Sequence, residues 1–233
     1  MKKYIFDEEL IKGLIKSRPN RFIMLVEIDG KTEKCHCPST GRIGNMEFKD
    51  IPCLLSKSRS TARKTNYTVE AISPSPKVWV GINQAKANKY VEFFLKKNLL
   101  RKMIDVEEIK REVKLNKSKI DFLVNNNCFL EIKTPLIHLP FGNRKDNNNF
   151  NSFERLARHF TDISLQIKKG QRAIALLCYF YDADEFRVPE KSNAEIVNIV
   201  KKATSRGLEN WQINLKIDKK GISLIDYFKL DLF

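Results

Sequence analysis

Three charged residues in one short stretch of this chain, Asp121, Glu131 and Lys133, are of the types that hydrolyse phosphodiester bonds. That reaction needs a metal ion, which polarises the phosphate and lowers the pKa of a water molecule, and a cation near the developing charge. The two carboxylates could bind Mg²⁺ (or Mn²⁺), a hard cation that prefers oxygen ligands and keeps several waters, and the backbone carbonyl of Ile132 could add a ligand. Lys133 would then orient the attacking water or stabilise the transition state.

A two-stranded hairpin would bring these side chains together. If residues 125–127, all asparagine, form a three-residue turn, the ladder centred on Asn126 sets Asp121 opposite Glu131. Alternation along the strands predicts one wholly apolar face and a charged face that looks out of the core. Opposed like charges, roughly 4.5 to 5.5 Å apart at Cβ, destabilise a strand pair unless a cation lies between them. In the same register Lys119 falls opposite Lys133, so an ordinary surface cluster of salt bridges stays open as an alternative.

Helical segments flank this hairpin and could complete the site. Apolar residues recur at helical spacing between residues 84 and 100, which predicts an amphipathic helix. Glu92 on this helix could complete the metal shell, or be a solvated helix residue. A second predicted helix, ended by Gly170, carries a basic cluster that could grip the phosphate, or form an ordinary basic face. The cluster consists of Arg155, Arg158 and His159.

The charge of the chain favours a polyanion as partner. The 233 residues include 43 Lys and Arg against 28 Asp and Glu, a formal charge of +15, while the apolar content of 42% is that of a folded protein. Because no basic amphipathic helix of the membrane-lying kind is found, nucleic acid is favoured over an anionic membrane. A biased genome, rich in Lys and Asn codons, is the alternative explanation.

Targeting and cysteine signals indicate a cytoplasmic protein. The first nine residues place acids where a signal peptide needs its apolar region, and the longest apolar run, Ala173 to Tyr181, is too short to span a bilayer. The five cysteines match no zinc spacing. The segment Cys35 to Cys37 is therefore predicted to be a strand with reduced thiols.

The chain divides into two predicted domains. Residues 1–75 show short alternating strands and tight turns, including Asp29-Gly30, which suggests a small β-barrel. Two prolines in Ser73 to Pro76 mark the boundary. Residues 76–233 alternate helices with strands, which predicts a mixed α/β domain. Within the barrel segment, a basic, hydroxyl-rich loop would contact phosphates in a nucleic-acid-binding protein and otherwise is solvated. Its candidate contacts are Arg59, Arg63 and Lys64.

The motif Asp-(x)9-Glu-x-Lys resembles the PD-(D/E)xK nuclease superfamily, and a wider set of motifs resembles one family, the sugar fermentation stimulation protein A (SfsA) family. Ser39 departs from this pattern, because the family usually has Asn there. The segment before Arg155 also departs, with Asn-Asn-Phe-Asn-Ser-Phe in place of Phe-Pro-Asp-Ala. The motifs that carry the resemblance are His36–Gly41, Arg63-Lys64, Val80–Asn83, Ala87-Asn88, Glu112–Lys114, Ser118–Phe122, Glu131–Lys133, Arg155, Arg158-His159 and Ser205–Gly207.

This resemblance implies an N-terminal OB-like β-barrel and a C-terminal restriction-endonuclease-like α/β domain with a mixed central sheet. It also implies DNA binding without marked sequence preference and a genetic link to the regulation of sugar use.

Three functions remain in contention. The leading one is a DNA-binding protein with a Mg²⁺-dependent nuclease site at Asp121, Glu131 and Lys133, assisted by Glu92. The main alternative is a non-enzymatic regulator of sugar (maltose-type) metabolism that binds DNA and keeps the nuclease scaffold. A sensor of a small ligand at the barrel loop containing Gly41 is the third. DNA is the predicted partner, no membrane partner is expected, and a homodimer stays open.

Overall fold

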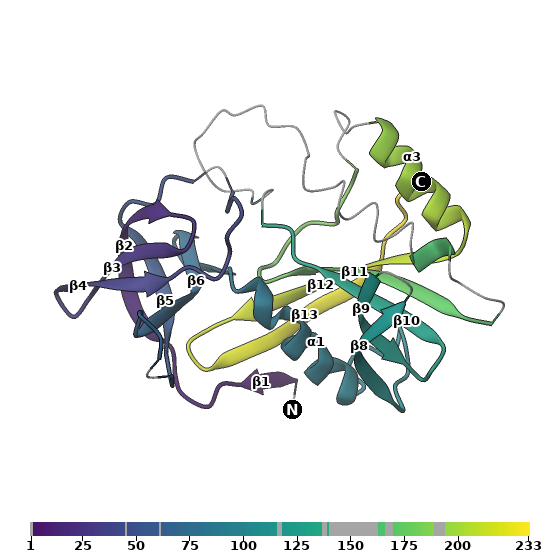
Figure 1. Cartoon of the computed structure of the whole chain (residues 1–233), viewed down its shortest axis with the longest axis horizontal. Coiled ribbons are helices and arrows are strands. Elements are labelled where there is room, and N and C mark those ends of the chain that lie inside the picture. The colour runs from purple at the N-terminus through teal and green to yellow at the C-terminus, as the bar shows by residue number, and fades with distance from the viewer. Residues whose placement is uncertain are drawn as a thin grey trace.

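A closed β-barrel and a larger, curled mixed sheet stand side by side in the computed structural model of the chain (Figure 1). The structure describes residues 2–44, 46–60, 62–115, 118–136, 139, 163–165, 170–188 and 194–233.

The barrel is built from five strands and confirms the OB-like prediction. Neighbouring strands pair antiparallel, and β4 closes the barrel against β6 in parallel, through Cys35 opposite Tyr67 and His36 opposite Thr68. A closed five-stranded barrel with this order is the OB type. A short strand, β7, continues the sheet beyond β6. The strands are β2 (Ile11–Asn20), β3 (Ile23–Ile28), β4 (Lys31–His36), β5 (Ile51–Lys57), β6 (Tyr67–Ser75) and β7 (Val78–Gly81).

Alternation of apolar residues fills the barrel. Met24, Val26 and Ile28 in β3 are buried at every second position, as a half-buried strand requires. The β3–β4 turn at Asp29-Gly30 has positive φ at both residues, 48° and 76°, which is the geometry of the predicted two-residue hairpin.

The larger sheet has seven strands in the order β1-β13-β12-β11-β10-β9-β8. Its centre is parallel, because β11 pairs in parallel with both β10 and β12, while the outer pairs are antiparallel. This mixed sheet confirms the predicted α/β class. Its strands are β1 (Lys3–Ile5), β8 (Ile109–Leu115), β9 (Ser118–Val124), β10 (Cys128–Lys133), β11 (Arg172–Tyr179), β12 (Leu208–Ile217) and β13 (Gly221–Lys229).

A helix covers each face of this sheet. The 3₁₀ turn η1 (Gln84–Lys86) leads into α1 (Ala87–Lys96), whose buried stripe is the one that the periodicity predicts and packs against the strands of one core. On the other face, α3 (Ala194–Ser205) contributes Val200 and Ala203 to a second core, and Gly207 with φ of 100° follows its end. The stripe of α1 comprises Ala87, Tyr90, Val91, Phe94 and Leu95.

In space, the predicted segment 1–75 is divided between the barrel and the larger sheet. Strand β1 pairs with β13 of the larger sheet rather than with the barrel. Ser73 to Pro76, predicted as a boundary, forms the β6–β7 hairpin, in which Lys77 takes a positive φ of 67°. Pro74 is tolerated there because the β6–β7 pairing is irregular between Ile72 and Ser75.

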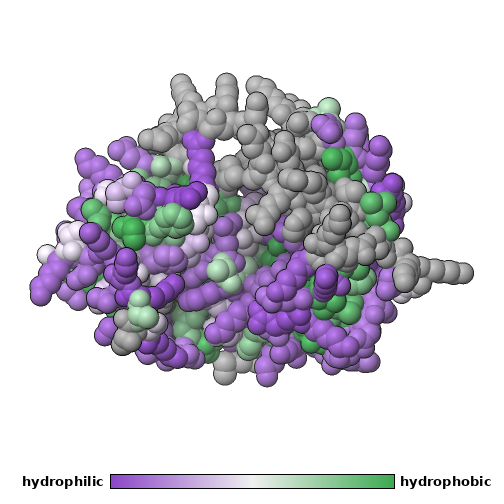
Figure 2. All heavy atoms as spheres, in the orientation of Figure 1, coloured by the Kyte–Doolittle hydropathy of each residue, from purple (hydrophilic) through white to green (hydrophobic). Residues whose placement is uncertain are grey.

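Hydrophilic side chains dominate the described part of the face in Figure 2, with apolar ones scattered among them. In the described part of the chain, no helix has the length and apolar character needed to cross a membrane. The apolar side chains are used in the cores instead, where the barrel core includes Tyr179 and Tyr181 from the end of β11.

The barrel and the larger sheet meet where Gly81 contacts Phe180. The Gly81 N–H donates to the Phe180 carbonyl at 3.1 Å. A Cβ added at Gly81 would lie 2.7 Å from the Phe180 Cβ, which is closer than any ordinary contact. The absence of a side chain at residue 81 therefore allows this close approach.

We expect Gly81→Ala to lower the free energy of unfolding by about 1 to 3 kcal/mol, the usual cost of overpacking a core. Chemical denaturation of the purified variant measures this loss. Gly41→Ala is the matched control, because an added Cβ at Gly41 meets nothing within 4 Å. Equal stability of the two variants would show that the Gly81 contact does not constrain the fold.

Candidate metal centre

The hairpin that carries the charged residues is closed by the asparagine triplet. Asn125 and Asn126 have φ of 50° and 58°, a left-handed conformation that Asn tolerates better than most residues. The Asn125 Oδ1 accepts from the N–H groups of Glu107 and Glu108 at 2.9 and 3.1 Å, which ties the turn to the start of strand β8. The predicted three-residue turn is confirmed.

The ladder between β9 and β10 has the predicted register and ends before Asp121 and Glu131. Phe122 lies opposite Leu130, the pair next to the charged residues. On the other side of β9, Glu112 of β8 takes a φ of 55°, although its neighbours in the chain stay in the ladder. A positive φ on a glutamate is strained backbone, and strain of this kind is concentrated at functional sites.

The Asp121 carboxylate accepts a hydrogen bond that a backbone carbonyl would accept in a regular ladder. Its Oδ2 accepts the backbone N–H of Ile132 at 2.7 Å, and its Oδ1 accepts from the Asn88 side chain of α1 at 2.7 Å. The Asp121 N–H donates in turn to the Glu131 Oε2 at 3.3 Å. These contacts lock the Asp121 carboxylate beside that of Glu131.

Glu131 is buried and is paired with Lys133. Its side chain is 3% exposed, and its Oε1 accepts from the Lys133 Nζ at 2.6 Å. Lys133 is 30% exposed, so the ammonium group lies between the buried carboxylate and solvent. Glu131 therefore contacts both the backbone of Asp121 and the side chain of Lys133, which brings together the three residues that the sequence singles out.

The electrostatics of the pair are unfavourable without a further cation. Burial first, and the charge of Glu131 second, raise the pKa of Asp121, while the Ile132 N–H, Asn88 and Lys133 act in the opposite direction. The net rise means that the favourable contacts of Asp121 do not offset its burial and the nearby charge of Glu131. A divalent cation would remove this remaining penalty.

Two details of the hairpin differ from the prediction. Glu131 does not look out of the core, because α3 and its neighbours cover this face with the second apolar core. Ile120 and Phe122, two residues apart, belong to different cores. The β9–β10 ladder ends at Phe122 opposite Leu130, so Ile120 lies beyond the part of the hairpin that is paired as a regular ladder.

The alternative of a salt-bridge cluster formed by Asp121, Glu131, Lys119 and Lys133 is wrong for Lys119. Lys119 pairs with Lys114 of β8 in the ladder, and its Nζ contacts the Glu112 carboxylate at 2.5 Å. Its side chain therefore turns to β8, whereas that of Lys133 contacts Glu131. Lys119 therefore does not offset the charges of Asp121 and Glu131, whereas Lys133 does.

On helix α1, it is Asn88 that reaches the site. Glu92, one turn later, has a side chain that is 14% exposed and is paired with Lys96 at 2.8 Å and with Arg111 at 3.6 Å. Its role as a helper stays a prediction. Asn88 could have been found from the sequence, because it shares a helix face with Glu92 at a spacing of four residues.

The predicted nucleic-acid contacts are only partly described. Arg59, Arg63 and Lys64 are exposed on the loop after β5. Arg59 is paired with Asp7 at 3.2 Å and Glu8 at 3.5 Å. The basic cluster Arg155, Arg158 and His159 lies outside the described residues. Of the segment that follows it, the structure describes residues 163–165, which are helical.

The donor set fits Mg²⁺ or Mn²⁺ better than a soft metal. Asp121 and Glu131 offer oxygen ligands, and Mg²⁺ is usually held by one or two carboxylates with waters and substrate phosphates in the other positions. Within the described ranges, no three His, Cys, Asp or Glu residues gather as a metal cluster. Cys35 lies in β4 and Cys37 directly follows that strand; both are buried, with free thiols whose pKa burial raises.

A second polar cluster was not predicted. Glu70 in β6 is only 2% exposed and accepts from Ser56, Asn83 and Lys86 at 2.5, 2.8 and 2.5 Å. The signal in the sequence was a lone glutamate inside the apolar run of β6. A buried charge needs partners, and those partners come from β5 and η1, which only the fold brings together.

The architecture defines a class of protein, an OB-type barrel joined to a mixed α/β domain with an acidic pair on one hairpin. Two protein-family models cover this architecture: the SfsA N-terminal OB domain matches residues 17–82, and the sugar fermentation stimulation protein RE domain matches residues 85–221. The chain therefore belongs to the sugar fermentation stimulation protein family.

Relatives over the full length support this assignment. The sugar fermentation stimulation protein homolog of Clostridium beijerinckii is 28% identical over 228 residues, which cover 94% of this chain and 96% of the relative. A homolog from Synechococcus sp. (strain JA-2-3B'a(2-13)) is 30% identical over 97% of this chain and 95% of its own.

The solved structure of Pyrococcus furiosus SfsA in complex with Ca²⁺ has the same fold. It superposes with a TM-score of 0.79 over 100% of this chain and 99% of that chain, at 20% identity.

We expect Mg²⁺ to stabilise the protein in a pH-dependent way. Because the pKa of Asp121 is raised, protons compete with the cation, so stabilisation is full above that raised pKa and is lost as pH falls through it. At about ten times Kd, Mg²⁺ should raise Tm by about 3 to 6 °C at roughly pH 8 and by clearly less at roughly pH 5.

Thermal unfolding in Mg²⁺ and in EDTA measures this shift. The control is Asp121→Asn, which should show no response to Mg²⁺ at either pH. A response of equal size in the wild type and in this variant would place the cation elsewhere.

Proposed function

We propose that this protein binds DNA and hydrolyses phosphodiester bonds at Asp121, Glu131 and Lys133 with a divalent cation. The observation that carries the proposal is the close placement of Asp121, Glu131 and Lys133, where burial first and the charge of Glu131 second raise the pKa of Asp121. A buried acidic pair beside a lysine is suited to a cation and to the phosphate that the cation attracts.

Each residue of the site has a defined task in this proposal. Asp121 and Glu131 would hold the cation, with the Ile132 carbonyl as a further ligand. The bound cation would polarise the phosphate and lower the pKa of a water molecule. The Ile132 N–H and the Asn88 side chain fix the Asp121 carboxylate in place. Lys133, released from Glu131 when the cation binds there, would stabilise the charge that develops on the phosphate.

Two further facts support the proposal. The formal charge of +15 suits a polyanionic substrate. Pyrococcus furiosus SfsA was solved as a complex with Ca²⁺, so a relative with this fold binds a divalent cation. The family name supports a link to the regulation of sugar use, to which DNA binding would be the route.

A non-enzymatic DNA-binding regulator is the second candidate, and one observation favours it. The Ile132 N–H, Asn88 and Lys133 already satisfy part of the carboxylate pair without any metal. A regulator of this kind would use the nuclease scaffold only for its shape and basic surface.

Asp121→Asn separates the two candidates. If the protein is a nuclease, this variant should cleave single- and double-stranded DNA at least about a hundredfold more slowly with Mg²⁺ or Mn²⁺, because one metal ligand is lost. DNA affinity should stay within about threefold, since a neutral side chain replaces an acid outside the basic surface. Gel assays of cleavage and fluorescence anisotropy of binding measure both quantities.

Asp29→Asn is the matched control, because Asp29 lies on an exposed turn with a φ of 48°, which asparagine also adopts. It should cleave at the wild-type rate. If the pure wild-type protein cleaves no DNA with either metal, the nuclease proposal fails and the regulator remains.

DNA binding itself predicts a salt effect at Lys64. Lys64→Met should weaken binding to all DNA sequences alike and reduce the slope of log K against log salt by about 1, since one phosphate contact is removed. Arg59→Met should have a smaller effect, because Asp7 and Glu8 already pair with Arg59. Anisotropy titrations at several salt concentrations test this. An unchanged slope in Lys64→Met would remove this loop from the DNA-binding surface.

A further inference from the structure

A second cavity lies at the junction of the barrel and η1, apart from the metal centre. It has a volume of about 480 Å³ and is lined by the ends of β4, β5 and β6, by the loop after β5 and by η1. This volume is in the range of small-molecule sites. Its lining is rich in hydroxyl groups, from Ser56, Ser58, Ser60 and Thr68.

The cavity carries an excess of positive charge. Four cations, Lys57, Arg59, Arg63 and Lys86, line it against the single carboxylate of Glu70, which leaves a net charge of +3. The Lys86 Nζ forms an ion pair with the Glu70 Oε1 at 2.5 Å. Among the residues that the structure describes, Arg63 has no acidic partner, and it donates to the Thr68 hydroxyl at 3.2 Å on the cavity wall.

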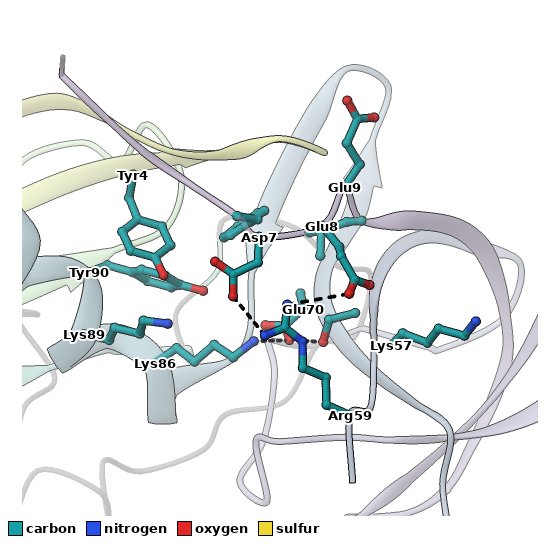
Figure 3. A pocket seen from close by; sticks show the side chains of 13 residues that line it. Tyr4, Asp7, Glu8, Glu9, Lys57, Arg59, Glu70, Lys86, Lys89 and Tyr90 are labelled. Atoms are coloured by element: carbon teal, nitrogen blue, oxygen red, sulfur yellow. Dashed lines mark hydrogen bonds and ion pairs between the residues drawn. The ribbon is translucent and has the colours of Figure 1, made fainter. Parts of the chain in front are cut away.

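A neighbouring cavity of about 200 Å³ provides a contrast. It shares Lys57, Arg59, Glu70 and Lys86 with the larger cavity of about 480 Å³, but the acidic segment 7–9 also lines it. Figure 3 shows Arg59 reaching toward Asp7 and Glu8, which bind its guanidinium group. Four acids, Asp7, Glu8, Glu9 and Glu70, there balance four bases, Lys57, Arg59, Lys86 and Lys89. Of these two cavities, the larger one is therefore the one that attracts an anion.

Two buried polar atoms at the larger cavity have no hydrogen-bond partner among the described residues. The first is the acceptor Oδ1 of Asn83, a residue that is 8% exposed. The Nδ2 of the same side chain donates to the Glu70 carboxylate. The His36 Nδ1 is the second such atom. Burial first, and Arg63 second, lower the pKa of His36, so its ring is neutral at pH 7. Buried polar atoms without partners are uncommon and call for an explanation.

We propose that this cavity binds a small phosphate monoester that also carries hydroxyl groups. The phosphate would lie against Arg63 and Lys57, and the hydroxyl groups of the ligand would meet the serine hydroxyl groups of the wall. A monoester suits the site because its two negative charges match Lys57 and Arg63, the cations left over once Lys86 pairs with Glu70 and Arg59 pairs with Asp7 and Glu8. Guanidinium groups also bind two phosphate oxygens at once.

The same short segment would link this ligand to the metal centre. Lys86 and Asn83 face the cavity, whereas Gln84 donates to the Thr134 carbonyl just after Lys133, and Asn88 holds Asp121. The cavity and the metal centre are thus on opposite sides of η1 and the start of α1, and the ligand site does not depend on the nuclease function.

Ribose 5-phosphate is the probe that tests this proposal, with calorimetric titration as the measurement. The wild-type protein should bind it, and should bind ribose or inorganic phosphate at least about tenfold more weakly, because each lacks one of the two recognised groups. Arg63→Met and, separately, Lys57→Met should weaken binding about tenfold or more. Both residues are exposed, so neither substitution disturbs the core.

Lys31→Met is the matched control, since Lys31 is an exposed lysine of the barrel that does not line the cavity. It should bind ribose 5-phosphate as the wild type does, and so should Asp121→Asn, whether or not the protein is a nuclease. No binding by the wild type, or equal binding in Arg63→Met, overturns the proposal. Binding of a 5′-phosphorylated oligonucleotide in place of ribose 5-phosphate, lost in Arg63→Met, would overturn the small ligand in favour of a nucleic-acid end.

Discussion

The interaction on which the candidate site depends is the repulsion between the carboxylates of Asp121 and Glu131. The fold holds them together through a strand ladder, a backbone N–H from Ile132 and a helix side chain, Asn88, although their charges oppose this. Burial makes the opposition stronger, because water cannot screen the pair. The divalent cation of the proposed function would offset this repulsion.

The segment from Ile82 to Asn88 joins the two halves of the molecule. Ser39 of the barrel donates to the Ile82 carbonyl, and the Gln84 side chain donates to the Thr134 carbonyl beyond β10. Lys86 neutralises Glu70 of the barrel, while Asn88 holds Asp121 of the larger sheet. This one segment therefore contacts residues of both the cavity and the candidate metal centre.

Local chemistry explains which predictions succeeded. The apolar stripe of α1 follows from its periodicity, and the hairpin turn follows from the tolerance of Asn125 and Asn126 for positive φ. Predictions about the surroundings of the hairpin were less accurate. Lys119 turned to Glu112 on a third strand, and the face expected to meet solvent was covered by α3. A two-strand ladder contains no information about the third strand or the covering helix, so neither could be read from it.

The sequence by itself determined the two-part architecture, the positive charge, and the contact between Asp121, Glu131 and Lys133, because each depends on composition or on spacing within one hairpin. Only the tertiary structure decided that Glu131 is buried, that Asn88 rather than Glu92 reaches Asp121, and that Glu70 meets Lys86 at a cavity. Those outcomes depend on residues far apart in the chain, and burial, which sets the strength of every charge interaction here, exists only once the elements have packed.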